Sequence, residues 1–515
     1  MTTTSYFGPP GTGKTFTLMN IVSNYLEQGS EPERIGFVSF SKKATEEARN
    51  RAASELNLDY KRMPYFRTLH SLAFRQLSLK IEDVMRGADY RRLEEMIGME
   101  FLSTSSMSLN DGEFFRMGSK GDMYLGVYNM ARVRGIPVEQ QFHETANFSL
   151  RLNELEHIVR SYEDYKQAAE KIDFTDMIRL FIENGEAPKL DALIVDEAQD
   201  LVPLQWQMVD KLAQNASDVF YAGDDDQAIY EWMGVNPKDF IERSMDTDNQ
   251  FTLGQSFRVP QEVHKFATSI TDSMHTRIDK AYEPREEPGS VSYHYDIDEL
   301  DLQNGEWMIL CRTNYIANKL AGQLKTMGHL FWRTGNGWSV SSRTLNAVRN
   351  WTKLTRGESL GLSEFQELWT MLKIDRYKKR AGNKKIKEAP KGDMLEDARD
   401  TFDMNFVTDI LGEDVREKIW YEILDVQAKE RVYITSVLES GEKFDDDNPR
   451  IVLSTIHKAK GGEADNVALF LQSSKACCTM GDPDCERRVF YVGATRAKQN
   501  LHIIESRDAR WSFRI

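Results

Sequence analysis

Residues 8–15 read Gly-Pro-Pro-Gly-Thr-Gly-Lys-Thr, between the short apolar stretch Ser5–Phe7 and a segment with helical patterning. This spacing, G-x-x-x-x-G-K-T after a strand and before a helix, is typical of a loop that cradles phosphates. Glycines let backbone N–H groups turn inward around phosphate oxygens, and the following helix offers its positive end. We expect Lys14 to reach the β- and γ-phosphates of a nucleotide and Thr15 to hold Mg²⁺. The residues expected to contact the nucleotide here are Gly8, Gly11, Thr12, Gly13, Lys14 and Thr15.

Short apolar segments recur along the chain, each followed by a polar or glycine-bearing turn and then by a helical pattern. Continuous β-branched runs between helices are typical of a parallel sheet that is covered on both faces. The sequence therefore predicts an α/β fold. The predicted strands are Ser5–Phe7, Ile35–Phe40, Ala192–Val195, Val219–Ala222, Trp307–Cys311, Ile451–Ser454, Val467–Leu471 and Leu501–Ile504.

This alternation of strands and helices stops twice. Residues 81–150 are charged, Met-rich and helical in pattern, and residues 357–444 are again helical and heavily charged. No repeat of fixed period and no low-complexity tract appears, which excludes solenoid and collagen-like folds. The two stretches indicate two mostly helical insertions, one inside each of two α/β domains.

A pair of carboxylates ends one predicted strand, in the stretch Asp-Ala-Leu-Ile-Val-Asp-Glu-Ala-Gln-Asp at residues 191–200. The carboxyl edge of a parallel sheet is where such folds place their ligands. Asp196 suits a metal ion, and Glu197 suits the polarisation of an attacking water. Acidic pairs at strand ends are common, and a Gly/Pro turn with a solvated lysine is the plain alternative for residues 8–15. The two motifs support each other because both occur in one chain.

Composition narrows the class of protein further. The chain has 515 residues, 40% of them hydrophobic, so it can build real cores and is not globally disordered. No apolar run approaches the roughly 20 residues that a bilayer span needs, and no signal peptide is visible. The net charge of -15 argues against a histone-like coat, but a motor can confine basic residues to one groove. Four cysteines make no disulfide framework and suit a reducing compartment.

Two local clusters have plain alternatives. Residues 376–387 form the densest basic run of the chain; a solvated loop and a contact with duplex phosphates both fit it. Cys477, Cys478 and Cys485 lie close together but lack C-x-x-C spacing, so the sequence does not favour a metal or iron–sulfur site.

Seven ordered motifs resemble those of the UvrD/Rep/PcrA group of superfamily-one DNA helicases, and they cover nearly the whole chain. The motifs are FVSFSKKATEEA at 37–48, RTLHSLA at 67–73, DFTD at 173–176, GDDDQAIYEW at 223–232, QSFR at 255–258, TIHKAKGGE at 455–463 and YVGATRA at 491–497. The resemblance implies two RecA-like P-loop domains with parallel sheets. It assigns residues 1–83 and 151–254 to the first, 84–150 to its helical insertion, 255–357 and 446–515 to the second, and 358–445 to its helical insertion.

Hydrolysis of ATP requires positive charge opposite the phosphate loop, because negative charge builds on the transferred phosphoryl oxygens. The resemblance points to Arg258 and Arg496 as such arginine fingers, although a surface arginine taken alone is more often salt-bridge material. Gln227 could bond the γ-phosphate or the attacking water. It would then report hydrolysis to the neighbouring Tyr230–Trp232 segment.

Aromatic side chains near these motifs suit a single strand, since every base offers a face for stacking. Trp232, Tyr230 and Phe40 are the candidate platforms, with core packing as the alternative for each. Polar groups expected to contact the strand backbone are Ser41, Thr68, His70, Arg312, Asn314 and His457. A lone histidine is more often a satisfied structural residue than a ligand.

The chain departs from the family around the adenine base. With seven residues before Gly8 in this sequence, we expect no counterpart of the glutamine that reads adenine in the family, and Phe16 stands where the family often has a stacking arginine. The base is expected between Phe16 and Phe257, and the resemblance suggests Glu463 for the ribose. Both expected insertions are also shorter than the family's.

The resemblance thus implies an ATP- and Mg²⁺-dependent DNA helicase or translocase moving 3′ to 5′ on single-stranded DNA. Its expected substrates are single strands and forked duplexes, with accessory replication or repair proteins as further partners and no membrane. The expected setting is the cytoplasm of a bacterial or phage-infected cell. Two alternatives stay open: a translocase that does not separate duplex, and a nucleotide-switched DNA-binding scaffold that hardly turns over.

Overall fold

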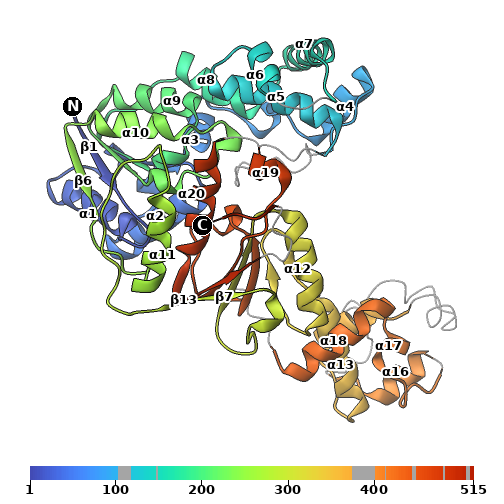
Figure 1. Ribbon diagram of the computed structural model, residues 1–515. Coiled ribbons are helices and arrows are strands. Elements are labelled where there is room, and N and C mark those ends of the chain that lie inside the picture. Colours follow the sequence, from blue (N-terminus) through green and yellow to red (C-terminus); the bar gives the residue numbers. More distant parts are fainter. Residues whose placement is uncertain are drawn as a thin grey trace. The chain divides into compact units, whose positions relative to one another are not determined.

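The computed structural model describes residues 1–102, 118–145, 149–373, 401–411, 413–442, 448–479, 482–505 and 511–514. They form two compact units (Figure 1). Unit 1 contains Met1–Ser290 and Ala476–Gln499, and unit 2 contains Val291–Lys475 and Asn500–Arg514. These units do not coincide with the domain boundaries that the resemblance implies, because residues 255–290 lie in unit 1. The four-part division therefore stays a prediction.

Unit 1 is built on a six-stranded sheet in which every pair of neighbouring strands is parallel. The strands, in their order across the sheet, are β3 (Phe66–Thr68), β2 (Ile35–Ser39), β4 (Leu190–Asp196), β5 (Ala216–Gly223), β1 (Thr2–Phe7) and β6 (Asn249–Thr252). Ser39 pairs with Asp196 and Phe7 with Gly223, so the carboxyl ends of these strands meet at one edge.

Helices cover both faces of this sheet, which explains its unbroken apolar strands. Phe37 and Ile194 point to one face, where they share a core with α1 (Lys14–Glu27) and α2 (Lys42–Glu55). Val38 and Val195 point to the other face, where α3, α8 and α9 pack. The helices on this second face are α3 (Leu69–Gln76), α8 (Phe174–Asn184), α9 (Pro203–Ala213) and α10 (Pro237–Met245). Two further helices of unit 1, α11 (Gln261–Thr271) and α20 (Pro483–Ala494), pack against each other.

A separate helical core lies within unit 1. It contains α4 (Gly87–Ile97), α5 (Lys120–Arg134), α6 (Val138–Glu144) and α7 (Leu152–Ala168). The apolar face of α7 supplies Leu155, Ile158 and Tyr162 to this core. Helix α7 thus packs with the helical insertion, although the boundary predicted from the sequence places the end of that insertion at residue 150.

Unit 2 carries a second, seven-stranded sheet in the order β10-β9-β11-β8-β12-β13-β7. Its strands are β7 (Ser290–His294), β8 (Trp307–Cys311), β9 (Trp332–Arg333), β10 (Gly337–Trp338), β11 (Ile451–Thr455), β12 (Ala464–Phe470) and β13 (Ala497–Ile504). Strands β9, β11, β8 and β12 run parallel, and β10 is antiparallel to β9. The helices of this unit are α12 (Asn314–Thr326), α13 (Ser342–Thr355), α14 (Leu362–Met371), α16 (Met404–Leu411), α17 (Trp420–Ile423) and α18 (Arg431–Ser440). Helix α19 (Lys475–Thr479) begins at the last residue of this part of unit 2 and continues into unit 1.

All eight predicted strands are present, within a few residues of their expected ends. The predicted α/β class, with two sheets dominated by parallel pairing, is confirmed. The missed strands are short or polar edges. Strand β6, for example, is exposed along its whole length and therefore has no apolar signature.

Candidate nucleotide and nucleic-acid sites

The carboxyl edge of the first sheet gathers most of the predicted site residues of unit 1. The phosphate loop follows β1, the acidic pair ends β4, and Asp224–Gln227 follows β5. These three strands are neighbours in the order β4-β5-β1. Phe40 and Thr68 belong to the ends of β2 and β3, on the β4 side of the same edge. The edge therefore carries nucleotide candidates at one end and DNA candidates at the other.

The phosphate loop is held by its own backbone. The Gly8 N–H donates to the Gly223 carbonyl over 2.9 Å, and Thr12 Oγ1 donates to the Pro9 carbonyl over 2.8 Å. Gly11 has a φ of 73°, in the left-handed region that favours glycine. A Cβ at Gly11 would come within 2.3 Å of the Arg258 Cβ, so only glycine fits here.

Lys14, in the first turn of α1, bonds the acidic pair. Its Nζ lies 2.6 Å from Glu197 Oε1 and 3.9 Å from Asp196 Oδ1. Burial opposes the lysine charge, yet the two carboxylates hold the pKa of Lys14 above its ordinary value. Burial and the Glu197 charge raise the pKa of Asp196 to about 6, against the opposing effect of Lys14. A further cation at this pair would therefore be favourable.

Glu197 is fixed from several sides. Its φ of 52° and ψ of 38° lie in the left-handed region, which is uncommon for a residue with a side chain. Its backbone N–H donates to Asp196 Oδ1 over 2.9 Å, and Gln199 Nε2 donates to its Oε2 over 2.6 Å. Gln199 Oε1 in turn accepts from the Asp224 N–H over 3.0 Å. This bridging role of Gln199 was not predicted from the sequence, although the residue lies only two positions after Glu197.

Gln227 and Arg496 are in contact. Gln227 Nε2 donates to Asp224 Oδ2 over 2.8 Å, and Arg496 Nη2 donates to Gln227 Oε1 over 3.0 Å. Arg496 follows α20 and is only 2% exposed, and its Nε also bonds the Val492 carbonyl. One of the two predicted arginine fingers therefore reaches the predicted sensor glutamine within unit 1.

Two exposed aromatic rings flank the phosphate loop. Phe16 is 59% exposed and Phe257 is 71% exposed. Phe257 Cε2 and Phe16 Cβ lie 3.8 Å and 4.0 Å from where a Cβ on Gly13 would stand. The segment carrying Phe257 is bonded to the loop, because the Phe257 N–H donates to the Gly11 carbonyl over 2.8 Å. Both rings thus lie at the loop, and their contact with a base stays a prediction.

A buried lysine that the sequence analysis missed holds the acidic run Asp224–Asp226. Lys280 Nζ lies 3.1 Å from Asp224 and from Asp226, and it also donates to Asp225. Arg277 donates to both carboxylate oxygens of Asp226, over 3.0 Å and 2.9 Å. These cations are more than 50 residues away along the chain, so no local sequence pattern predicts their ion pairs with Asp224–Asp226.

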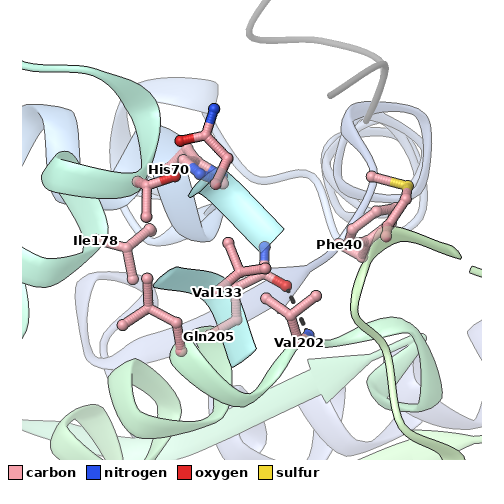
Figure 2. Close-up of a pocket in the computed structure, with 10 residues that line it drawn as sticks. Phe40, His70, Val133, Ile178, Val202 and Gln205 are labelled. Carbon is pink, nitrogen blue, oxygen red and sulfur yellow. Dashed lines mark hydrogen bonds between the residues drawn. The ribbon is translucent and has the colours of Figure 1, made fainter. Parts of the chain in front are cut away.

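The predicted aromatic platforms form one group. The rings of Phe40 and Tyr230 are 5.4 Å apart, and those of Tyr230 and Trp232 are 6.5 Å apart. Tyr230 is half-buried, while Trp232 is 45% exposed. A small apolar pocket adjoins this group, and Figure 2 shows Phe40 and His70 among its lining residues.

The predicted strand-contacting polar groups of unit 1 have structural duties as well. Ser41 and Thr68 cap α2 and α3, because their hydroxyls accept from the Ala44 and Ser71 N–H groups. The His70 ring meets Phe174 edge-on at 6.0 Å, and burial lowers the pKa of His70 to about 4. The imidazole is therefore neutral at physiological pH.

Four predicted residues lie in unit 2. Arg312 and His457 follow β8 and β11, which pair in register up to Cys311 and Thr455. Asn314 begins α12, and Glu463 is exposed in the turn before β12. Their contacts with DNA or ribose stay predictions.

One predicted feature cannot be compared with the structure. The basic run 376–387 lies outside the described residues.

The remaining observations concern the cysteines, metal binding and the membrane. Cys485 donates to the Glu231 carboxylate, and burial raises the pKa of its thiol. Among the described residues no three or more His, Cys, Asp and Glu side chains are grouped to hold a metal ion. Within those same ranges, no helix has the length and apolar character to span a bilayer.

A glycine loop after β1, a lysine on the following helix and an acidic pair on a nearby parallel strand define a P-loop nucleotide-binding fold. Residues 6–248 match the UvrD/REP helicase N-terminal domain, and residues 342–508 match the UvrD-like helicase C-terminal domain. The chain belongs to the UvrD/Rep helicase family, a family of ATP-dependent DNA helicases.

Individual relatives are distant. The ATP-dependent DNA helicase PcrA of Leuconostoc citreum is 25% identical over 286 residues, which cover 52% of this chain and 37% of the relative. The ATP-dependent DNA helicase Rep of Buchnera aphidicola (strain APS) is 24% identical over 275 residues, or 50% of this chain and 41% of the relative. The putative helicase YjcD of Bacillus subtilis is 25% identical over 338 residues, or 59% and 43%. The aligned part thus spans less than half of each relative.

Proposed function

We propose that this chain is an ATP-driven motor that moves 3′ to 5′ along single-stranded DNA and separates forked duplexes. The observation that carries the proposal is a chain of hydrogen-bonded residues at the carboxyl edge of the first sheet. It runs from Lys14 through Glu197, Gln199 and Asp224 to Gln227. Three residues beyond Gln227 along the backbone, the aromatic group begins with Tyr230.

The nucleotide end fits a Mg²⁺-bound triphosphate. Asp196 and Thr15 offer the carboxylate and hydroxyl oxygens that Mg²⁺ prefers. Gly11 and Gly13 have the positive φ values that allow backbone N–H groups to turn toward phosphate oxygens. When bound, Mg²⁺ would neutralise charge on the phosphate oxygens. Lys14 would then bind the β- and γ-phosphates, and Glu197 would orient the attacking water and accept its proton.

The two arginines complete the proposed charge stabilisation. Arg496 lies against Gln227, and the Arg258 Cβ lies against Gly11 of the loop. Positive groups that face the transferred phosphoryl group lower the barrier because they stabilise the negative charge that grows on its oxygens. Gln227 contacts both Asp224 and Arg496, so a change at the phosphates would alter its hydrogen bonds.

The DNA end would receive that change through the backbone. The segment from Gln227 to Trp232 is short, and Trp232 exposes nearly half of its surface. A base stacked on an aromatic ring contributes roughly 1–3 kcal/mol. A shift of this segment with each ATP cycle would therefore change the grip on the strand.

Two assays test the proposal. Steady-state ATPase is measured with and without single-stranded DNA, and strong stimulation is the expected result. Unwinding of duplexes with a 3′ or a 5′ single-stranded tail then tests strand separation and polarity. Turnover without stimulation would overturn the motor. Stimulation with no unwinding of either fork would leave a translocase in its place.

A further inference from the structure

A basic pocket lies beside the DNA end of the sheet edge, and most of its lining residues have no role in the proposed function. It has a volume of about 190 Å³ and lies between α2, β3 and α3. Because water takes about 30 Å³ per molecule in the liquid, a phosphate group can enter it. Its lining residues are Lys42, Thr45, Glu46, Arg49, Phe66, Arg67, Thr68, Ser71 and Phe74.

Arg67 is anchored at the wall of this basic pocket. Its Nε donates to the Pro64 carbonyl over 2.8 Å, and its Nη1 donates to Ser71 Oγ over 3.1 Å. A guanidinium has five N–H donors in a planar fork, so two bonds hold the group and leave donors for a ligand. The Ser71 hydroxyl accepts from Arg67 and can donate its own hydrogen.

Among the described residues, no carboxylate forms an ion pair with Arg67. Burial lowers the pKa of Arg67, and the neighbouring Arg75 and Arg49 charges lower it further. Arg49 lies over the Tyr60 ring at 5.1 Å, and its buried Nε has no hydrogen-bond partner among the described residues. In a chain with a net charge of -15, clustered cations without counter-charges mark a place for an anion.

The one carboxylate in the lining, that of Glu46, is paired with a lining lysine rather than with either arginine. Glu46 lies at the exposed rim, one helical turn from Lys42, and their charged groups are 3.3 Å apart. Such an exposed pair contributes little to stability. It leaves the two guanidinium groups uncompensated.

The position of the pocket indicates which anion it takes. Thr68, a predicted strand-contacting residue, is itself part of the lining. Thr68 pairs in register with Ser39, and Ser39 directly precedes Phe40. A strand that stacks on the aromatic group and passes Thr68 would bring its backbone to the mouth of the pocket.

We propose that the basic pocket binds a phosphodiester of the single strand, with the Arg67 and Arg49 guanidinium groups and the Ser71 hydroxyl as its ligands. The proposal rests on the proposed function, because it needs a strand on this edge of the sheet. It adds a backbone-binding subsite beyond the aromatic group. An acidic peptide is the competing occupant.

Fluorescence anisotropy with a labelled oligothymidylate tests the subsite. Arg67→Gln and Arg49→Gln are each expected to weaken binding roughly five- to tenfold and to lower the log–log salt slope by about 0.7. Arg51→Gln is the matched control, because Arg51 lies two residues further along α2 and pairs with Glu47. Its affinity is expected to stay within about twofold, as for other exposed pairs. Thermal unfolding of each variant checks that the fold is intact.

A chemical change in the DNA sharpens the test. Single phosphodiesters are replaced in turn by neutral methylphosphonates. With wild-type protein one position is expected to weaken binding roughly as much as Arg67→Gln does. With Arg67→Gln the same position is expected to cost nothing more, because the charge has already lost its partner.

Four results would overturn the inference. If wild type does not bind the strand, the proposed function fails and the subsite fails with it. If wild type binds and both pocket variants match Arg51→Gln, or if all methylphosphonate effects simply add, only the subsite fails. If the pocket variants keep DNA affinity but lose binding of polyglutamate, the occupant is an acidic peptide.

Discussion

The two ends of the carboxyl edge in unit 1 are built on opposite plans. At the nucleotide end, Lys14 bonds Glu197 and Arg496 bonds Gln227, so the candidate catalytic groups satisfy one another. At the DNA end, rings contact rings, and Arg49 and Arg67 have no carboxylate partner among the described residues. In a hydrogen-bonded network, replacing one member can abolish the function of all of them. Separate contacts instead contribute independently, so each substitution removes only part of the binding free energy. The comparison predicts which variants abolish activity and which only weaken it.

The largest effect is expected at the nucleotide end, from Glu197→Gln. Loss of a positioned general base costs about 10²–10⁴ in rate, so DNA-stimulated kcat should fall at least a hundredfold. ATP binding should persist, because the carboxylate acts at the water rather than on the ground-state nucleotide. Lys14→Ala should abolish both. Turnover assays and nucleotide binding by equilibrium dialysis check this, and retention of a tenth of wild-type kcat in Glu197→Gln would refute the role.

A partial loss is expected at the DNA end, from Trp232→Ala. The exposed ring should contribute roughly 1–3 kcal/mol of strand affinity, and its removal should also reduce DNA stimulation of the ATPase. Strand affinity is measured by anisotropy, and Phe251→Ala is a matched control because Phe251 is a similarly exposed aromatic residue on β6, at the far edge of the sheet. Equal affinities for wild type and Trp232→Ala would make Trp232 a surface residue without a DNA role.

At the DNA end, His70 should make the folding stability of the protein depend on pH. His70 has a folded-state pKa of about 4, below the ordinary value of 6.5. Its neutral form therefore contributes stability that is present above pH 6.5 and lost as the pH falls toward 4. Compared with His70→Gln, wild type should lose about 2 kcal/mol of unfolding free energy between pH 7.5 and pH 5. Urea unfolding of both proteins measures the difference, and parallel pH curves would show that the ring is not buried.

The smallest effect is expected for the identity of the base. Phe16 and Phe257 flank the phosphate loop as exposed rings, and stacking tolerates both purines. GTP should therefore support hydrolysis within about tenfold of ATP in kcat/KM, or about 1.4 kcal/mol. Phe257→Ala should raise KM for both nucleotides together. A preference for ATP beyond a hundredfold would mean that a polar group reads the base.

Local spacing made the nucleotide end predictable. The geometry can be predicted for residues 8–15 and for the pair Asp196–Glu197, because a single continuous loop or strand carries each motif. Lys280 was missed, since it reaches Asp225 from 55 residues away and nothing near it in sequence distinguishes it from a surface lysine. A pairing across such a distance depends on tertiary packing rather than on any period or motif.

The same limit applies to the fold. Buried strands such as Ile35–Ser39 were visible as apolar runs, whereas the exposed edge strand Asn249–Thr252 was not. The sequence of α7 has the pattern of an ordinary amphipathic helix and does not indicate which core it joins. Only its contacts show that Leu155 and Tyr162 join the core of the helical insertion.

The ion pair between Lys14 and Glu197 has a consequence for wasteful turnover. In the structure the lysine covers one oxygen of the proposed base, and Gln199 bonds the other. If the triphosphate draws Lys14 to itself as we propose, the Glu197 carboxylate becomes available to bind water only after ATP has bound. The pair would then work as an interlock, in which arrival of the substrate switches on the group that consumes it.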